Sequence, residues 1–146
     1  MELADCLKFA NENPVCFLAT CEQGLPRVRC MGFWFADETG FYFQSGTTKE
    51  LHRQIQSNPN IEVCFYKSSG MIGETMRVSG KAELVFDEEL KKKVIRDRPF
   101  LKSFGLDYDS PQLTIFRIAS GRVHFWNMRS NFTPKKYVYF GDEGQW

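Results

Sequence analysis

The chain is a succession of short segments rich in β-branched and aromatic residues, each ended by residues that favour turns. These segments are residues 15–21, 26–35, 41–45, 61–66, 74–86 and 113–126. The stretches 2–13, 49–57 and 87–99 instead space apolar residues as a helix does. This order predicts a mainly β fold with inserted helices, in which the strands form an antiparallel barrel that is closed or nearly closed. An open sheet would expose long apolar edges, although periodicity alone does not separate a barrel from a sandwich.

A single domain is expected over residues 1–146, because this length suits one core and no repeat or linker interrupts it. Composition is that of a globular domain, and 14 Phe favour a β-rich core or a stacking site for a flat ligand. Nineteen Lys and Arg balance 18 Asp and Glu. A net charge of +1 attracts neither nucleic acid nor an anionic membrane, so neither partner is expected.

The sequence favours a cytoplasmic location. It has no uninterrupted apolar run of the roughly 18 residues that a transmembrane helix needs, and its first residues lack the pattern of a signal peptide. Its cysteines are Cys6, Cys16, Cys21, Cys30 and Cys64, without a C-x-x-C pair, which favours reduced thiols. Only two histidines are present, without companion ligands, so neither a metal site nor a catalytic residue is predicted.

The first three β segments are separated by short turns, which predicts an antiparallel meander. Within 26–35, strict alternation places Arg27, Arg29, Met31, Phe33 and Phe35 on one face of the strand. That face changes from cationic to apolar along its length, which suits an amphiphilic cofactor with a phosphate tail. A solvent-facing strand with two arginines is the alternative interpretation.

The segment Gly46–Leu51 predicts an anion site. Thr47 and Glu50 have the spacing of a capping box, with Thr47 as the N-cap of the following helix. Backbone N–H groups at the helix start, the hydroxyls of Thr47 and Thr48, and the Lys49 ammonium would then converge on a phosphate monoester. An ordinary capped helix start with a solvated lysine remains the alternative.

Two further local features are predicted. Asp87 is placed to be the N-cap of the helix that runs toward Pro99. Ser120–Gly121 interrupts the last long β segment and predicts a bulge or bend there. Residues 129–146 show no clear periodicity.

Several motifs follow one another in a specific order: PVCFLAT at 14–20, GLPRVRCM at 24–31, FYFQSGTTK at 41–49, Asn58-Pro59 and RVSGKA at 77–82. In this order and spacing the chain resembles the FMN-binding split β-barrel family related to pyridoxamine 5′-phosphate oxidase. It is most similar to the short branch that contains nitroimidazole-resistance-type reductases and general-stress-type flavoproteins. The resemblance covers about residues 1–127 and leaves 128–146 as a C-terminal tail.

This resemblance implies a homodimer that binds two FMN molecules in clefts between its subunits. It assigns the family's Arg-x-Arg-x-Met strand to Arg27, Arg29, Cys30 and Met31, with the backbone of Cys30 and Met31 flanking the isoalloxazine ring or the ribityl chain. Ring contacts fall on Gln44 and Ser45. The phosphate-binding turn falls on Thr47, Thr48 and Lys49, and Trp126 is the aromatic residue that the partner subunit supplies.

The chain departs from true pyridoxamine-phosphate oxidases in two places. Thr48 stands where an arginine is usual, and the Arg-x-His motif expected after Trp126 is missing. The resemblance therefore implies an FMN-dependent oxidoreductase for another small-molecule substrate. The alternatives are a flavin-binding or redox-sensing protein without turnover, or the same fold with a deazaflavin or haem. Neither histidine is placed by a motif to hold haem.

Overall fold

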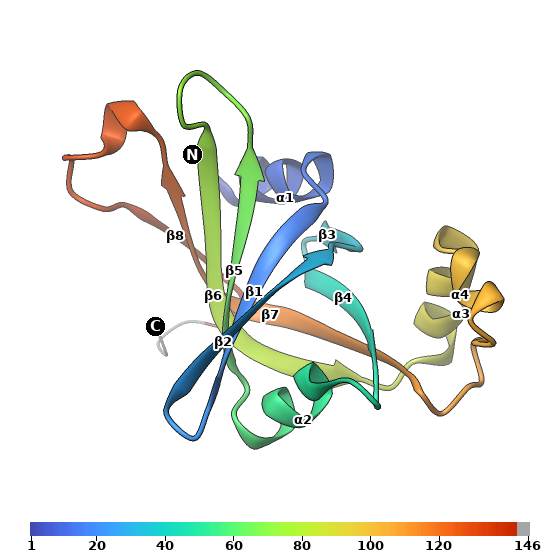
Figure 1. The fold of residues 1–146 in the computed structure, drawn as a ribbon. Coiled ribbons are helices and arrows are strands. Elements are labelled where there is room, and N and C mark those ends of the chain that lie inside the picture. Colours follow the sequence, from blue (N-terminus) through green and yellow to red (C-terminus); the bar gives the residue numbers. More distant parts are fainter. Residues whose placement is uncertain (143–146) are drawn as a thin grey trace.

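The structure, a computed structural model, describes residues 1–142 of the 146-residue chain (Figure 1). Its helices are α1 (Leu3–Glu12), α2 (Glu50–Ser57), α3 (Glu88–Asp97), α4 (Phe100–Ser103) and the 3₁₀ helix η1 (Met128–Ser130). Its strands are β1 (Val15–Glu22), β2 (Leu25–Gly32), β3 (Phe35–Asp37), β4 (Gly40–Gly46), β5 (Asn60–Lys67), β6 (Glu74–Val85), β7 (Leu113–Trp126) and β8 (Tyr137–Phe140).

The strands form one antiparallel sheet in the order β2-β1-β5-β6-β7-β4-β3, and β8 also pairs with β7. This confirms the predicted mainly β fold with inserted helices, in the manner of a split barrel. The sheet is not closed, because its path ends at β2 on one side and at β3 on the other.

The predicted meander is wrong. The segment expected to be one strand over 26–35 ends at Gly32, and the chain then crosses over to the far end of the sheet, where β3 pairs with β4. The Phe33 side chain is 2% exposed and lies in the core, and its backbone N–H donates to the Pro14 carbonyl at 2.5 Å. Alternation continues through this crossing, so the pattern gave no sign that pairing had changed.

Two local predictions are confirmed. The Asp87 carboxylate accepts a hydrogen bond from the Leu90 backbone N–H at 3.1 Å and caps α3. The register of β6 and β7 shifts beside Gly121, where two residues of β7 lie opposite one of β6. A Cβ on Gly121 would lie 2.0 Å from the Ser79 carbonyl oxygen, so this close approach requires glycine.

Sequence analysis missed α4, η1 and β8. Each has only three or four residues, too few for a periodic pattern to show. The strand β8 lies in the tail and pairs with β7 through residues 121–124, so the tail extends the sheet.

The core has two parts. The larger lies among the strands and α1 and contains the packed rings of Phe33, Phe43, Phe65 and Phe116. The smaller lies between α3, α4 and the first half of β7, at the side of the sheet where the two helices stand in Figure 1. Helix α2 packs against β1 and β4. In residues 1–142, no helix has both the length and the apolar character needed to cross a membrane.

Candidate functional site

Arg27, Arg29 and Met31 share the inner face of β2, as alternation predicts. The β1–β2 register sets them opposite Thr20, Leu18 and Cys16, all three of which are buried. Met31 packs against the larger core, whereas Arg29 is half-buried and Arg27 is exposed. The two arginines therefore occupy different environments on one face.

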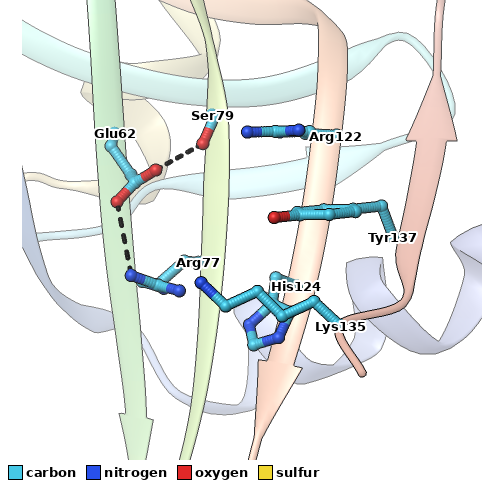
Figure 2. Close-up of a pocket in the computed structure, with 7 residues that line it drawn as sticks. All are labelled: Glu62, Arg77, Ser79, Arg122, His124, Lys135 and Tyr137. Atoms are coloured by element: carbon cyan, nitrogen blue, oxygen red, sulfur yellow. Dashed lines mark hydrogen bonds and ion pairs between the residues drawn. The ribbon is translucent and has the colours of Figure 1, made fainter. Parts of the chain in front are cut away.

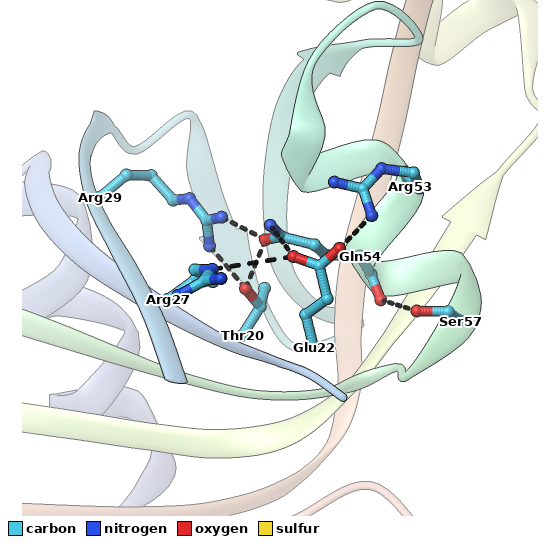
Figure 3. Close-up of polar contacts among 7 residues, drawn as sticks. All are labelled: Thr20, Glu22, Arg27, Arg29, Arg53, Gln54 and Ser57. Carbon is cyan, nitrogen blue, oxygen red and sulfur yellow. Dashed lines mark hydrogen bonds and ion pairs between the residues drawn. The ribbon is translucent and has the colours of Figure 1, made fainter. Parts of the chain in front are cut away.

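Arg29 is held by a buried polar cluster between β1, β2 and α2 (Figure 3). Its guanidinium donates to the Thr20 hydroxyl at 3.0 Å and to the side-chain carbonyl of Gln54. Gln54 is fully buried, and its carbonyl also accepts from Thr20 at 2.6 Å. Burial lowers the pKa of Arg29, with the charge of Glu50 opposing this shift.

Arg27 belongs to the outer part of the same cluster. Its Nε lies 3.7 Å from Glu22, which also accepts hydrogen bonds from Arg53 and, at 3.1 Å, from the Gln54 amide. The hydrogen bond from Arg53 lowers the pKa of Glu22, and Gln54 and Arg27 add to this effect. Glu22 is therefore shared by Arg27 and Arg53 at the rim and offsets one of their two charges.

The predicted capping box is wrong. The Lys49 N–H donates to the Gly46 carbonyl at 3.2 Å, which closes a turn with Thr47 and Thr48 at its centre. The Thr47 N–H is meanwhile bound to the Gln112 carbonyl at 2.9 Å. Helix α2 consequently begins two residues later, at Glu50, with Lys49 as its N-cap.

The start of α2 nevertheless retains the features of an anion site. Its N-cap residue makes no capping hydrogen bond with its side chain, so donors of the first turn are left for another acceptor. Thr47, Thr48 and Lys49 are all exposed beside it. Gln54 lies in the next turn of the same helix, so α2 connects this surface to Arg29.

Cys30 and Met31 lie at the open end of the sheet. Because β2 pairs only with β1 among the described strands, one row of its backbone N–H and C=O groups has no partner strand. The Cys30 side chain is exposed on the outer face. This edge can hydrogen-bond a flat polar ring through the backbone.

Gln44 and Ser45 point to opposite faces of β4. The Ser45 hydroxyl and that of its cross-strand neighbour Thr114 are both buried without a hydrogen-bond partner among the described residues. Gln44 is half-buried and accepts from the Arg98 guanidinium at 3.2 Å.

Arg98 is a candidate that sequence analysis missed. It is the C-cap of α3, and its other terminal nitrogen lies 3.7 Å from the position of a Cβ on Gly32, at the end of β2. Burial lowers its pKa. No local motif marks it, because only the packing of α3 brings it between β2 and β4.

Trp126 lies far from the Thr47–Lys49 turn. The first residue of β7, Leu113, pairs with Gly46 beside the turn, and Trp126 ends the same strand. Thirteen residues of a straight strand span about 40 Å. In Figure 1, α2 and the loop after β7 lie at opposite ends of the molecule. Trp126 instead lines a groove of about 700 Å³ beside residues 130–138.

The outer face of β1, β2 and β5 is apolar and exposed. Exposed fractions are 57% for Val15, 44% for Phe17, 71% for Val28 and 46% for Tyr66. The register places Phe17 between Cys30 and Cys64. Contiguous exposed apolar surface of this kind is typical of protein interfaces.

Residues 1–142 contain no cluster of three His, Cys, Asp or Glu side chains able to hold a metal ion.

Comparison with solved structures shows the same fold. A NimC/NimA family protein from Clostridium acetobutylicum superposes with a TM-score of 0.79 at 24% identity, covering 94% of this chain and 92% of that one. General Stress Protein 26 from Bacillus anthracis gives 0.75 at 18% identity, covering 96% and 100%. An FAD-binding protein from Mesorhizobium loti gives 0.62 at 22% identity, covering 86% and 94%.

The family is shown by the sequence itself. The family model described as pyridoxamine 5′-phosphate oxidase matches residues 3–127, from the first helix through the end of β7. Residues 128–146, the tail, lie outside this match. The chain belongs to the pyridoxamine 5′-phosphate oxidase family.

Proposed function

We propose that this chain is an FMN-dependent oxidoreductase that acts on a small molecule as a homodimer. Membership of the family and a structural neighbour named as an FAD-binding protein support a flavin cofactor. The choice of FMN, which has one phosphate, rests on the anion site of this chain.

The observation that carries the proposal is the uncapped first turn of α2, with exposed Lys49 at its N-cap and Arg29 bound to the same helix. Lys49, Thr47 and Thr48 would hold the FMN phosphate at the open first turn of this helix. Arg29 is fixed to the same helix through Gln54, with hydrogen bonds that set the direction of its guanidinium. Arg27 is more exposed and would reach the phosphate only by leaving Glu22.

The flavin ring would lie along the open edge of β2. The Phe33 N–H bonds to the Pro14 carbonyl, and the register continues this pattern to Met31 and Cys16, so the backbone groups of Cys30 are the ones left unpaired at the edge. Gln44, held by Arg98, would approach the ring from the side of β4. When bound, the flavin supplies hydride or electron transfer, and the chain supplies anchoring, orientation and a partly dry environment.

The homodimer is supported by the apolar outer face of β1, β2 and β5 and by the position of Trp126. A second copy packed on this face would cover Phe17 and Val28. Because Trp126 is at the far end of β7 from its own Thr47–Lys49 turn, only the partner's Trp126 could complete that site.

The absorption spectrum of the freshly purified protein tests the cofactor. We expect flavin bands, and release of FMN rather than FAD on denaturation. A Soret band, deazaflavin absorption or a colourless protein that does not take up FMN would contradict the proposal. Oxidation of a nicotinamide donor by the FMN-loaded protein then tests turnover, and its absence with a range of acceptors would indicate a flavin-binding or redox-sensing protein.

A further inference from the structure

A second cationic hollow lies on the second half of β7, nine or more residues along the strand from Leu113, which pairs beside the Thr47–Lys49 turn. It is formed by residues of β5, β6, β7 and β8, together with Lys135 just before β8. Its volume is about 120 Å³, several times what one water molecule needs. The lining residues are Glu62, Arg77, Ser79, Arg122, His124, Lys135 and Tyr137. Figure 2 shows the ends of Arg77, Arg122, Lys135 and Tyr137 around a common space.

The charge of this hollow is unbalanced. Arg77, Arg122 and Lys135 contribute three cations, and Glu62 is the one acid among the described lining residues. Glu62 is already engaged, since it accepts from the Ser79 hydroxyl at 2.5 Å and lies 3.9 Å from Arg77. Arg122 and Lys135 are left without an acidic partner among the described residues. Cations that line one small hollow favour an anion between them, because the anion relieves their mutual repulsion.

His124 lines the hollow and carries a buried polar atom. Its side chain is only 8% exposed, and its Nδ1 has no hydrogen-bond partner among the described residues. A buried polar atom without a partner costs free energy unless a ligand or water satisfies it. Burial lowers the pKa of His124, and the charges of Arg77 and Lys135 lower it further, so a bound anion would reverse the second effect.

The tail holds the hollow in shape. Tyr137 pairs with His124 through β8, and the Arg122 guanidinium lies 4.2 Å from the centre of the Tyr137 ring. Stacking on an aromatic ring orients a guanidinium without using its N–H donors. Arg122 is therefore positioned in advance, and its donors remain for a ligand.

We infer that this hollow binds a small oxyanion, the carboxylate or phosphate group of a ligand, between Arg122, Lys135 and His124. The inference goes beyond the proposed flavin function, because the Thr47–Lys49 turn lies beside Leu113, at the opposite end of β7 from His124. It gives the tail, which lies outside the family match, a binding role.

The two histidines of the sequence make the test direct, because each gives its own imidazole NMR signals. The protein is saturated with FMN, so that the flavin phosphate site is filled, and titrated with sodium phosphate or sodium acetate at fixed pH and ionic strength. His124→Gln identifies the His124 signals. We expect them to shift saturably with phosphate, acetate or both. The anion that binds more tightly identifies the anionic group of the ligand.

Matched variants locate the site. Arg122→Gln and Lys135→Gln should each weaken anion binding about tenfold, the effect of losing one charge-assisted contact. Lys136→Gln removes the neighbouring exposed lysine, which does not line the hollow, and should leave the affinity within about twofold. Glu62→Gln removes the competing carboxylate and should tighten binding.

The inference fails if the His124 signals do not shift saturably, or if Lys136→Gln has the same effect as Lys135→Gln. It also fails if those signals follow protein concentration instead of anion, because a carboxylate from a second copy would then fill the hollow. Repeating the titration on FMN-free protein separates the oxyanion hollow from the proposed FMN-dependent function. If the His124 signals still shift saturably with anion but the protein does not bind FMN, only the proposed function is refuted.

Discussion

The Arg29 guanidinium on β2 donates a hydrogen bond to the buried side-chain carbonyl of Gln54 on α2. This bond fixes the edge strand of the sheet to the helix whose first turn forms the candidate phosphate site. Gln54 also accepts from Thr20 on β1, so its carbonyl connects both strands to the helix. The position of the site and the stability of the fold therefore depend on the same contacts.

Replacement of Arg29 by lysine should lower both stability and FMN affinity. A single ammonium cannot contact Thr20 and Gln54 in the geometry of the guanidinium fork, and the loss is about 1–3 kcal/mol. Replacement of exposed Arg27 by lysine should change stability by less than about 0.5 kcal/mol. Urea unfolding of the apo-protein and FMN titration by fluorescence quenching measure the two effects. Equal stability of both variants would show that the Arg29 contacts are unimportant.

Acid should remove a stabilising contribution of Glu22. Because the hydrogen bond from Arg53 lowers its folded-state pKa below the ordinary 4.5, the unfolded chain binds more protons between the two values. This contribution is complete above pH 4.5 and is lost as the pH falls through the lowered pKa. The free energy of unfolding, measured at a series of pH values, should differ between wild type and Glu22→Gln, and this difference should shrink below pH 4.5. Arg53→Gln should weaken the pH dependence of the free energy of unfolding below pH 4.5. A difference between wild type and Glu22→Gln that does not change with pH would contradict this role of Glu22.

Lys49→Ala should weaken FMN binding about ten- to a hundredfold, because a charge-assisted contact with phosphate contributes about 1.5–3 kcal/mol. Riboflavin, which lacks the phosphate, should bind the unchanged protein much more weakly than FMN and be insensitive to this variant. Lys102→Ala, on the exposed face of α4, is the matched control. Equal binding of both flavins would show that the start of α2 does not hold the phosphate.

Val28→Asp should convert the proposed dimer to a monomer. Val28 is 71% exposed in the single chain, so the fold should tolerate a carboxylate there, whereas an apolar interface would not. Phe104→Asp, at the C-cap of α4 and 75% exposed, is the control and should leave assembly unchanged. Light scattering measures mass, and FMN titration should show loss of affinity together with the dimer. A wild-type monomer that retains FMN would refute the shared site.

Much of the fold could be predicted from local pattern. Segments with enough residues to show a period, such as β5, β6 and α3, lie within a few residues of their predicted bounds. The bulge at Gly121 and the cap at Asp87 were also readable, since each depends on residues adjacent in sequence. Pairing was not. The change of partner at Phe33 occurs without any change in alternation, so the predicted meander was wrong.

The candidate site divides in the same way. Arg27 and Arg29 share a face as alternation predicts, but only tertiary packing shows that Gln54 binds one of them and that Glu22 lies beside the other. Arg98 reaches Gln44 across 54 positions in sequence, and no local motif could reveal this contact. Whether these residues hold FMN stays a prediction.

The length of β7 has a genetic consequence. One strand begins beside its own phosphate turn and ends at Trp126, so in the proposed dimer each chain contributes unlike parts to two sites. A chain with Lys49→Ala and a chain with Trp126→Ala would each be defective alone. Their mixed dimer would combine both lesions in one site and leave the other intact. Two inactive alleles expressed together should therefore restore up to half the activity per mixed dimer.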